Sequence, residues 1–139
     1  MVRFPILAGA ALAVTALPVA AQVVSAFSEP RLPVNRLSNT TFEVIEKYGA
    51  GPRQIWCAAA DYAINTLGDD RGRIYVVTPR GPAQTAAGAK GVAFSTQDPG
   101  IAVSTGYSVT TDVAGANLLI IHAEQFCNDY LIEPGDTLP

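Results

Sequence analysis

The sequence predicts a small single domain of the α+β class, with an antiparallel or mixed sheet of about four strands, two helices and one disulfide. Three observations predict this class. Several short segments have the apolar pattern of strands, two longer segments repeat apolar residues at helical intervals, and two cysteines follow a segment typical of an export signal. A chain of 139 residues is long enough for one core of this kind.

The first 21 residues predict a signal peptide. A basic start ending at Arg3 precedes the apolar run 4–17, and the small residues Val19, Ala20 and Ala21 form a cleavage motif that leaves Gln22 as the new N-terminus. An uncleaved anchor is the alternative, although the run lacks a basic flank after it. We therefore expect a periplasmic or extracellular protein without a membrane span after cleavage.

The charge of the mature chain argues against nucleic-acid binding. The full sequence carries 9 basic and 12 acidic residues, so removal of Arg3 leaves 8 minus 12, a net charge of −4. Residues 22–39 contain two prolines and no periodicity, which predicts an extended N-terminal arm. Residues 40–139 then form the domain.

The first half of the domain predicts a strand, a helix and a second strand. Residues 41–48 alternate apolar and polar residues, with Phe42 and Val44 on one side and Glu43 on the other. A helix begins at Pro52, carries an apolar stripe from Ile55 to Leu67 and stops at Gly68. The near-continuous apolar run within 73–78 then indicates a central strand covered on both faces.

The second half is less regular. Residues 79–91 are rich in Pro, Gly and Ala and predict a loop, whereas 92–96 and 107–113 have the pattern of strands. Asn117 is suited to cap a final helix that includes Leu119, Ala123 and Phe126. The run 118–121 also fits a strand, because four apolar residues do not reveal a period.

Cys57 and Cys127 are expected to pair, because an oxidising compartment preserves disulfides. The bond would close a loop of about 70 residues, for which the chain-entropy estimate is about 4 kcal/mol. Two free thiols are the alternative if the chain is not exported. A thiol-redox centre is disfavoured because no C-x-x-C occurs.

No residue pattern identifies a catalytic centre or a cofactor site, and we expect no cofactor. His122 is the only histidine, so a small hydrolase or lyase would need it together with a carboxylate such as Asp61 or Glu124; a surface histidine is the simpler interpretation. Zinc lacks a fourth ligand, and the pair Asp69-Asp70 suits a polar turn better than a calcium loop. We expect no metal.

Two segments remain as candidate sites. Asp61, next to Tyr62, would be a buried polar node if it faced the sheet, although a solvent-facing side chain is the simpler interpretation. The loop 79–91 is a candidate binding loop or a plain connector. Its side chains suited to binding an anion or a partner are Arg80, Gln84, Thr85 and Lys90.

Several segments together resemble an uncharacterised family of small exported bacterial proteins. The most specific is Trp56-Cys57-Ala58-Ala59 followed by Asp61-Tyr62. The others are Phe42-Glu43-Val44, Gly51-Pro52, Arg73-Ile74-Tyr75-Val76, Gly81-Pro82 with Thr85, and Phe126-Cys127. The resemblance implies a bacterial envelope or secreted setting and supports pairing of the two cysteines. It implies no activity, ligand or catalytic residue.

By exclusion, the sequence favours a non-enzymatic binding or interaction module whose partner is a protein or another envelope component. An inhibitor that inserts a rigid loop into the cleft of a hydrolase is one concrete form. Two alternatives stay open: the hydrolase or lyase built on His122, and a structural envelope component that self-associates through 118–121.

Overall fold

The computed structural model describes residues 31–103 and 109–130. The predicted signal peptide and the first part of the predicted arm, up to residue 30, lie outside these ranges. In chain order the elements are β1 (Val34–Arg36), β2 (Thr41–Glu46), α1 (Pro52–Asn65), β3 (Arg73–Pro82), β4 (Lys90–Ser95), β5 (Asn117–Leu119), α2 (Ile120–Gln125) and the 3-10 helix η1 (Phe126–Tyr130). The predicted α+β class with one disulfide is confirmed.

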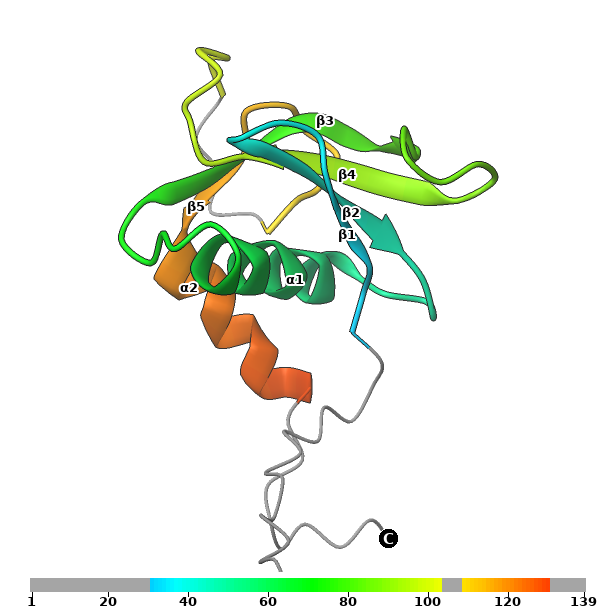
Figure 1. The fold of residues 1–139 in the computed structure, drawn as a ribbon, viewed down its shortest axis with the longest axis horizontal. Helices are drawn as coiled ribbons and strands as arrows, with labels where there is room; N and C mark the ends of the chain where they lie inside the picture. Colours follow the sequence, from blue (N-terminus) through cyan, green and yellow to red (C-terminus); the bar gives the residue numbers. More distant parts are fainter. Residues whose placement is uncertain (1–30, 104–108, 131–139) are drawn as a thin grey trace, which may run out of the picture.

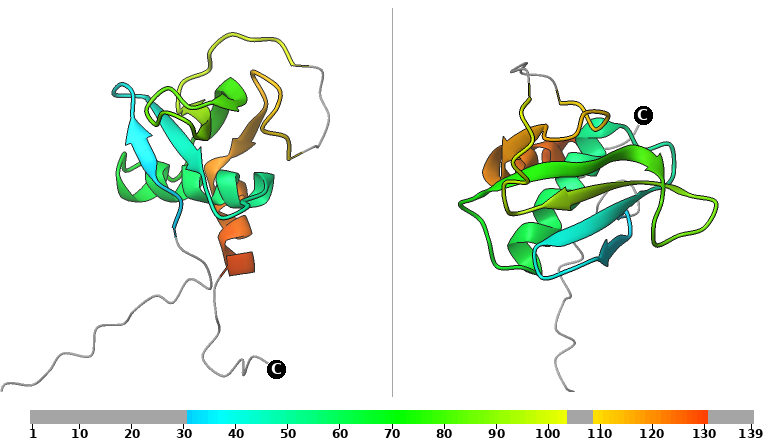
Figure 2. Two further views of the ribbon diagram at one scale, coloured as in Figure 1. Left: turned by 90° about the vertical axis from the view of Figure 1, so that its right-hand side faces the viewer. Right: turned by 90° about the horizontal axis from the view of Figure 1, so that it is seen from above.

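The five strands form one antiparallel sheet in the order β1-β2-β4-β3-β5, and both α-helices lie on one side of it (Figures 1 and 2). The strand β1 was not expected. β1 lies within the predicted arm 22–39, where Val34 pairs with Val44 and Arg36 pairs with Phe42 of β2. The sheet therefore begins before residue 40.

The helix α1 covers the sheet, as predicted. Pro52 occupies its first turn after an extended Gly51, and the chain turns away at Gly68, whose positive φ of 72° suits glycine. The alanines of α1 are small enough to let the helix approach the strands closely. The core between helix and sheet includes Phe42, Val44, Trp56, Ala59, Ala60, Ala63, Ile74, Val76, Val92 and Phe94.

Aromatic contacts order the centre of this core. Phe42 and Phe94 lie opposite each other on β2 and β4, and their ring centroids are 6.0 Å apart. The Trp56 ring meets the Phe94 ring edge-on at 5.0 Å. Stacked and edge-on ring pairs of this kind add to the free energy gained by burying apolar area. The alternation of β2 then places Glu43 and Ile45 on the opposite face of the sheet.

The C-terminal segment resolves the ambiguity of the run 118–121. Residues up to Leu119 pair with β3, and the helix α2 begins at Ile120. The predicted cap at Asn117 is wrong: this residue belongs to β5, where its side chain accepts a hydrogen bond from Arg73 and donates one to the Gly115 carbonyl. The long apolar run continues from strand to helix because Leu118 and Ile120 both pack on the core.

The strand predicted over 107–113 is wrong within the described residues. Residues 109–113 are irregular, and 107–108 lie outside the described ranges. In place of a strand, single backbone hydrogen bonds join residues 111–116 to β3. Arg80 donates to the Thr111 carbonyl at 2.9 Å, and Val76 donates to the Ala116 carbonyl at 2.8 Å. Isolated bonds of this kind satisfy the edge of β3 without forming a ladder.

Candidate functional site

The predicted loop 79–91 is the end of a β-hairpin rather than a free loop. Pro79 to Pro82 belong to β3, and Lys90 and Gly91 belong to β4, so only residues 83–89 form the turn. The pairing shifts register between Val76 and Thr78 and again before Gly81. Pro79, which has no backbone N–H to donate, falls within this irregular stretch.

The turn folds back over the sheet. Pro82 and Lys90 pair with each other, and Lys90 also pairs with Glu46 on β2. Glu43 lies three residues further into the sheet than Glu46, yet Gln84 and Thr85 both reach it. The turn therefore covers the outer face of β2, at the right-hand end of the sheet in Figure 1.

Glu43 is the residue of the candidate site that its sequence pattern does not indicate. Its side chain is only 2% exposed. One carboxylate oxygen accepts the Gln84 backbone N–H at 2.8 Å, and the other accepts the Thr85 backbone N–H at 2.9 Å and the Thr85 hydroxyl at 2.6 Å. Asn35 on β1 donates to the same hydroxyl oxygen at 2.8 Å. The buried carboxylate of Glu43 thus ties the turn to β2, and Asn35 ties it to β1.

The pKa of Glu43 reflects these contacts. Burial raises the pKa, because it disfavours the charged form. The hydrogen bonds from the Thr85 hydroxyl and from the backbone N–H groups of Gln84 and Thr85 together lower it by more, so the pKa lies below its ordinary value. Glu43 is therefore ionised at neutral pH despite its burial.

One of the two predicted cations of the hairpin, Arg80, binds a carboxylate. Arg80 donates to both carboxylate oxygens of Glu46, at 2.5 and 2.6 Å. These hydrogen bonds lower the pKa of Glu46; burial opposes the effect, and the charges of Arg80 and Lys90 reinforce it. The same hydrogen bonds raise the pKa of Arg80. Arg80 is therefore engaged within the fold, which leaves Lys90 as the cation of this pair available to a ligand.

Tyr48 adds an exposed aromatic ring at the same end of the sheet. It follows Lys47 just after β2 and is 63% exposed. Its φ of 58° lies in the left-handed region, which bulky residues rarely adopt. We call the set formed by Lys47, Tyr48, the turn 83–89 and Lys90 the hairpin-end surface.

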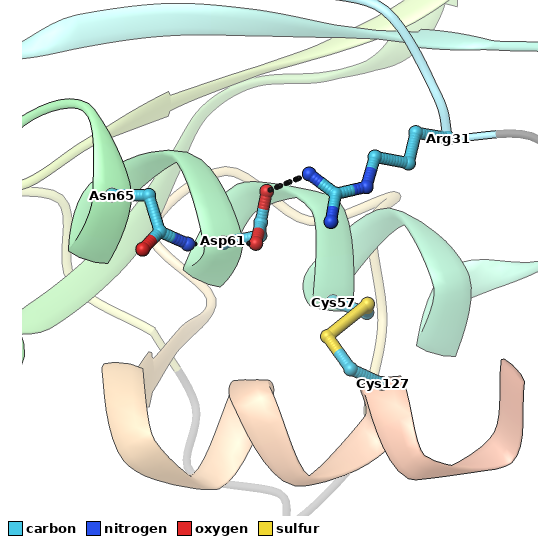
Figure 3. Close-up of polar contacts among 5 residues, drawn as sticks. All are labelled: Arg31, Cys57, Asp61, Asn65 and Cys127. Carbon is cyan, nitrogen blue, oxygen red and sulfur yellow. Dashed lines mark hydrogen bonds and ion pairs between the residues drawn. A yellow bond between two sulfur atoms is a disulfide. The ribbon is translucent and has the colours of Figure 1, made fainter. Parts of the chain in front are cut away.

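Asp61 does not form the buried polar node that was considered. Its side chain is 36% exposed, accepts a hydrogen bond from Asn65 at 2.8 Å and lies 3.8 Å from the Arg31 guanidinium (Figure 3). The neighbouring Tyr62 instead packs its ring on Phe42, with centroids 4.6 Å apart. The simpler, solvent-facing interpretation of Asp61 holds because position 61 lies outside the buried stripe of α1.

The disulfide between Cys57 and Cys127 joins α1 to η1 (Figure 3). The Cα atoms are 5.0 Å apart, and the bond spans 70 residues. Arg53, one turn before Cys57, adds two contacts to the same segment: it donates to Asp129 at 2.7 Å and lies 4.4 Å above the Phe126 ring. The predicted cysteine pairing is confirmed, and the C-terminal segment is fastened to α1 at several points.

His122 lies exposed on α2. The hydrogen bonds and ion pairs found among residues 31–103 and 109–130 do not include it, so no histidine–carboxylate pair is formed there. The run 118–121 presents little apolar surface for self-association, because Leu118 and Leu119 are half-buried, Ile120 is buried and only Ile121 is largely exposed, at 49%.

The part of the chain that the structure describes holds no group of three or more His, Cys, Asp or Glu side chains able to bind a metal ion. Asp69 instead accepts the backbone N–H groups of Arg71 and Gly72, which accounts for the acidic pair as a turn. No helix among the described residues has the length and apolar character needed to cross a membrane.

Comparison of the chain with protein-family models, curated proteins and solved structures finds no match. The resemblance to a family of exported bacterial proteins therefore stays a prediction. The candidate site is defined by its geometry alone.

Proposed function

We propose that this chain is an exported, disulfide-stapled, non-enzymatic binding protein that recognises a protein or another envelope component through the hairpin-end surface. The observation that carries the proposal is the attachment of an exposed turn to a buried carboxylate. Gln84 and Thr85 are both exposed residues, yet their backbone is fixed by Glu43. A loop that is already ordered loses little conformational entropy when it binds.

The chemistry of the surface also favours recognition. Lys47 and Lys90 are the only lysines in the sequence, and both lie at this end of the sheet. Neither takes part in an ion pair within residues 31–103 and 109–130. Tyr48, next to Lys47 in the chain, provides an exposed ring, and tyrosine is enriched at protein interfaces. Two lysines and an exposed aromatic ring at one end of the sheet suit a partner with acidic groups.

The disulfide supports the proposed location. Disulfides persist in oxidising compartments such as the periplasm and the extracellular space, and the chain begins with a segment typical of an export signal. An inhibitor of an envelope hydrolase is one form of the proposal. In that form the turn 83–89 would enter the cleft of the enzyme, as a rigid loop does in standard-sized inhibitor complexes.

Site-specific photocrosslinking in cells tests the proposal. A photoreactive residue replaces exposed Ala87 in the turn, and a control replaces exposed Gln97, beyond the opposite end of β4. We expect a crosslinked species of defined mass from position 87 and none from position 97. The species should be lost in Lys90→Glu and Tyr48→Ala variants.

Arg71→Glu is the matched control for charge reversal, because Arg71 is exposed in the α1–β3 connection, away from the hairpin end. This variant should retain the crosslink. A crosslink that appears from position 97 but not from 87, or one unaffected by Lys90→Glu and Tyr48→Ala, would remove the hairpin-end surface from the proposal. Arg80 is unsuitable as a probe, since its replacement also breaks the contact with Glu46.

A further inference from the structure

The attachment of the turn 83–89 to β2 depends on a single ionisable group. Residues 83–89 read Ala-Gln-Thr-Ala-Ala-Gly-Ala and contain no titratable side chain. Within the turn, Ala83 donates to the Ala89 carbonyl at 2.9 Å and Ala89 to the Ala86 carbonyl at 3.2 Å, which closes the turn but does not hold it on the sheet. The contacts to β2 are the three hydrogen bonds accepted by Glu43.

Protonation of Glu43 changes the role of one of its oxygens. All three groups that face the carboxylate are donors: two backbone N–H groups and one hydroxyl. A carboxylic acid has one O–H donor in place of an acceptor. The Thr85 hydroxyl can rotate to accept that proton, but the N–H groups of Gln84 and Thr85 cannot reverse. Protonation therefore weakens the attachment of the turn.

Among the described residues, no charged side chain donates a hydrogen bond to Glu43. On β1, Arg36 donates to the Ser38 carbonyl and to Asn39. On β4, Lys90 lies opposite Glu46, which the alternation of β2 places on the other face of the sheet from Glu43, and on β3 Arg80 binds Glu46. Asn35, which also faces the cluster, is neutral. Neutral donors thus dominate the surroundings of the Glu43 carboxylate.

We infer that Glu43 is an acid-sensitive latch that holds Gln84 and Thr85 against the sheet when ionised and releases them when protonated. The latch regulates the shape of the hairpin-end surface. Its role in regulating recognition rests on the proposed function, whereas the release itself is a property of the isolated chain. The direction of the Glu43 pKa places the release on the acidic side of the ordinary glutamate range.

Amide hydrogen exchange measured by NMR on the full mature chain tests the latch without any partner. Protection factors, which correct for the intrinsic effect of pH, are compared for the amides of Gln84, Thr85 and Val76 between pH 7 and pH 3. Val76 is the internal reference because its N–H donates to the Ala116 carbonyl. We expect the protection of Gln84 and Thr85 to fall about tenfold on acidification, while Val76 stays protected.

Glu43→Gln is the decisive variant, because glutamine keeps one acceptor oxygen but presents an N–H₂ group to a donor. Its Gln84 and Thr85 amides should be weakly protected at pH 7 and should not change further at pH 3. Equal protection in this variant and in the wild type at pH 7, or the same loss on acidification in both, would overturn the latch.

Thr85→Val keeps the inference testable if Glu43→Gln does not fold. It removes the hydroxyl bond and leaves both backbone N–H donors in place. The Glu43 pKa, followed through its side-chain carbon signal, should rise in this variant, and the Gln84 and Thr85 amides should lose protection at higher pH than in the wild type. An unchanged Glu43 pKa would contradict the assigned contact. The crosslinking from position 87 is measured separately, so failure of the latch and failure of recognition at the hairpin-end surface are distinguishable.

Discussion

Gly91 leaves room for the side chain of Glu43. A Cβ atom added at Gly91 would lie 3.1 Å from both Cγ and Cδ of Glu43 and 3.1 Å from the Val44 carbonyl oxygen. The Glu43 side chain has little freedom to move away from an added Cβ atom, because it accepts three hydrogen bonds. Glycine at position 91 thus makes space on β4 for a carboxylate that comes from β2.

Gly91→Ala should lower the free energy of unfolding by about 1–3 kcal/mol, the usual range for an overpacked interior site. Gly81→Ala is the matched control, since Gly81 pairs with Gly91 across the hairpin and an added Cβ there would meet only the Pro79 carbonyl oxygen at 3.7 Å. Urea denaturation of both variants measures the difference. Equal losses would show that close packing against Glu43 is not the cause.

Glu43→Gln should lower the free energy of unfolding at pH 7 by about 1–3 kcal/mol, because a buried N–H donor loses its acceptor. The folded-state pKa of Glu43 is lowered, so its ionisation stabilises the fold above the unfolded-state pKa, and this contribution is lost as pH falls through the folded-state pKa. Denaturation curves between pH 7 and pH 3 should show a shallower loss of stability in the variant than in the wild type. Parallel pH profiles would contradict the assigned pKa direction.

Two hydrogen bonds join Arg80 to Glu46, and we expect this contact to form again when the two residues are swapped between the positions. Charge reversal at either position, Arg80→Glu or Glu46→Arg, should lower the melting temperature, and the double variant should recover most of the loss because the pair is restored in the opposite sense. Both side chains reach the surface, so each single loss should be smaller than that of Glu43→Gln. Additive losses in the double variant would argue against a direct contact.

Cys57→Ser, Cys127→Ser and the double variant should each lower the free energy of unfolding by similar amounts. The entropy of the 70-residue loop gives about 4 kcal/mol for the loss of the bond. Equilibrium denaturation of the three variants under non-reducing conditions checks this. A much larger loss in one single variant than in the double variant would show that a mutated side chain acts by itself rather than through the bond.

The arrangement of helix and sheet could be predicted because its residues repeat at short range. The apolar stripe of α1 and the alternation of β2 each carry a period within a few residues. The continuous run within 73–78 predicted a strand, but the expected covering on both faces is wrong, because Ile74 and Val76 are buried whereas Tyr75 and Val77 are only half-buried. The strand β1 could not be read in the same way, since three residues are too few to show an alternation. The end of β5 and the start of α2 share one apolar run, so the boundary at Ile120 depends on tertiary pairing with β3.

The candidate site was predicted in part. Arg80, Gln84, Thr85 and Lys90 do lie together at one end of the sheet, but the carboxylates that organise them come from β2. Glu43 looks like an ordinary solvent-facing residue in an alternating strand. Its burial results from a turn about 40 residues away in the chain, and sequence spacing does not reveal a contact of that range.

The crosslinking yield from position 87 in wild type and in Glu43→Gln, measured in cells at neutral pH, tests the central claim most directly. We predict a strong crosslink from position 87 in the wild type, a much weaker one when the same position is used in a folded Glu43→Gln chain, and none from position 97 in either. Equal yields from position 87 in the two chains would contradict the claim that Glu43 prepares the hairpin-end surface for its partner.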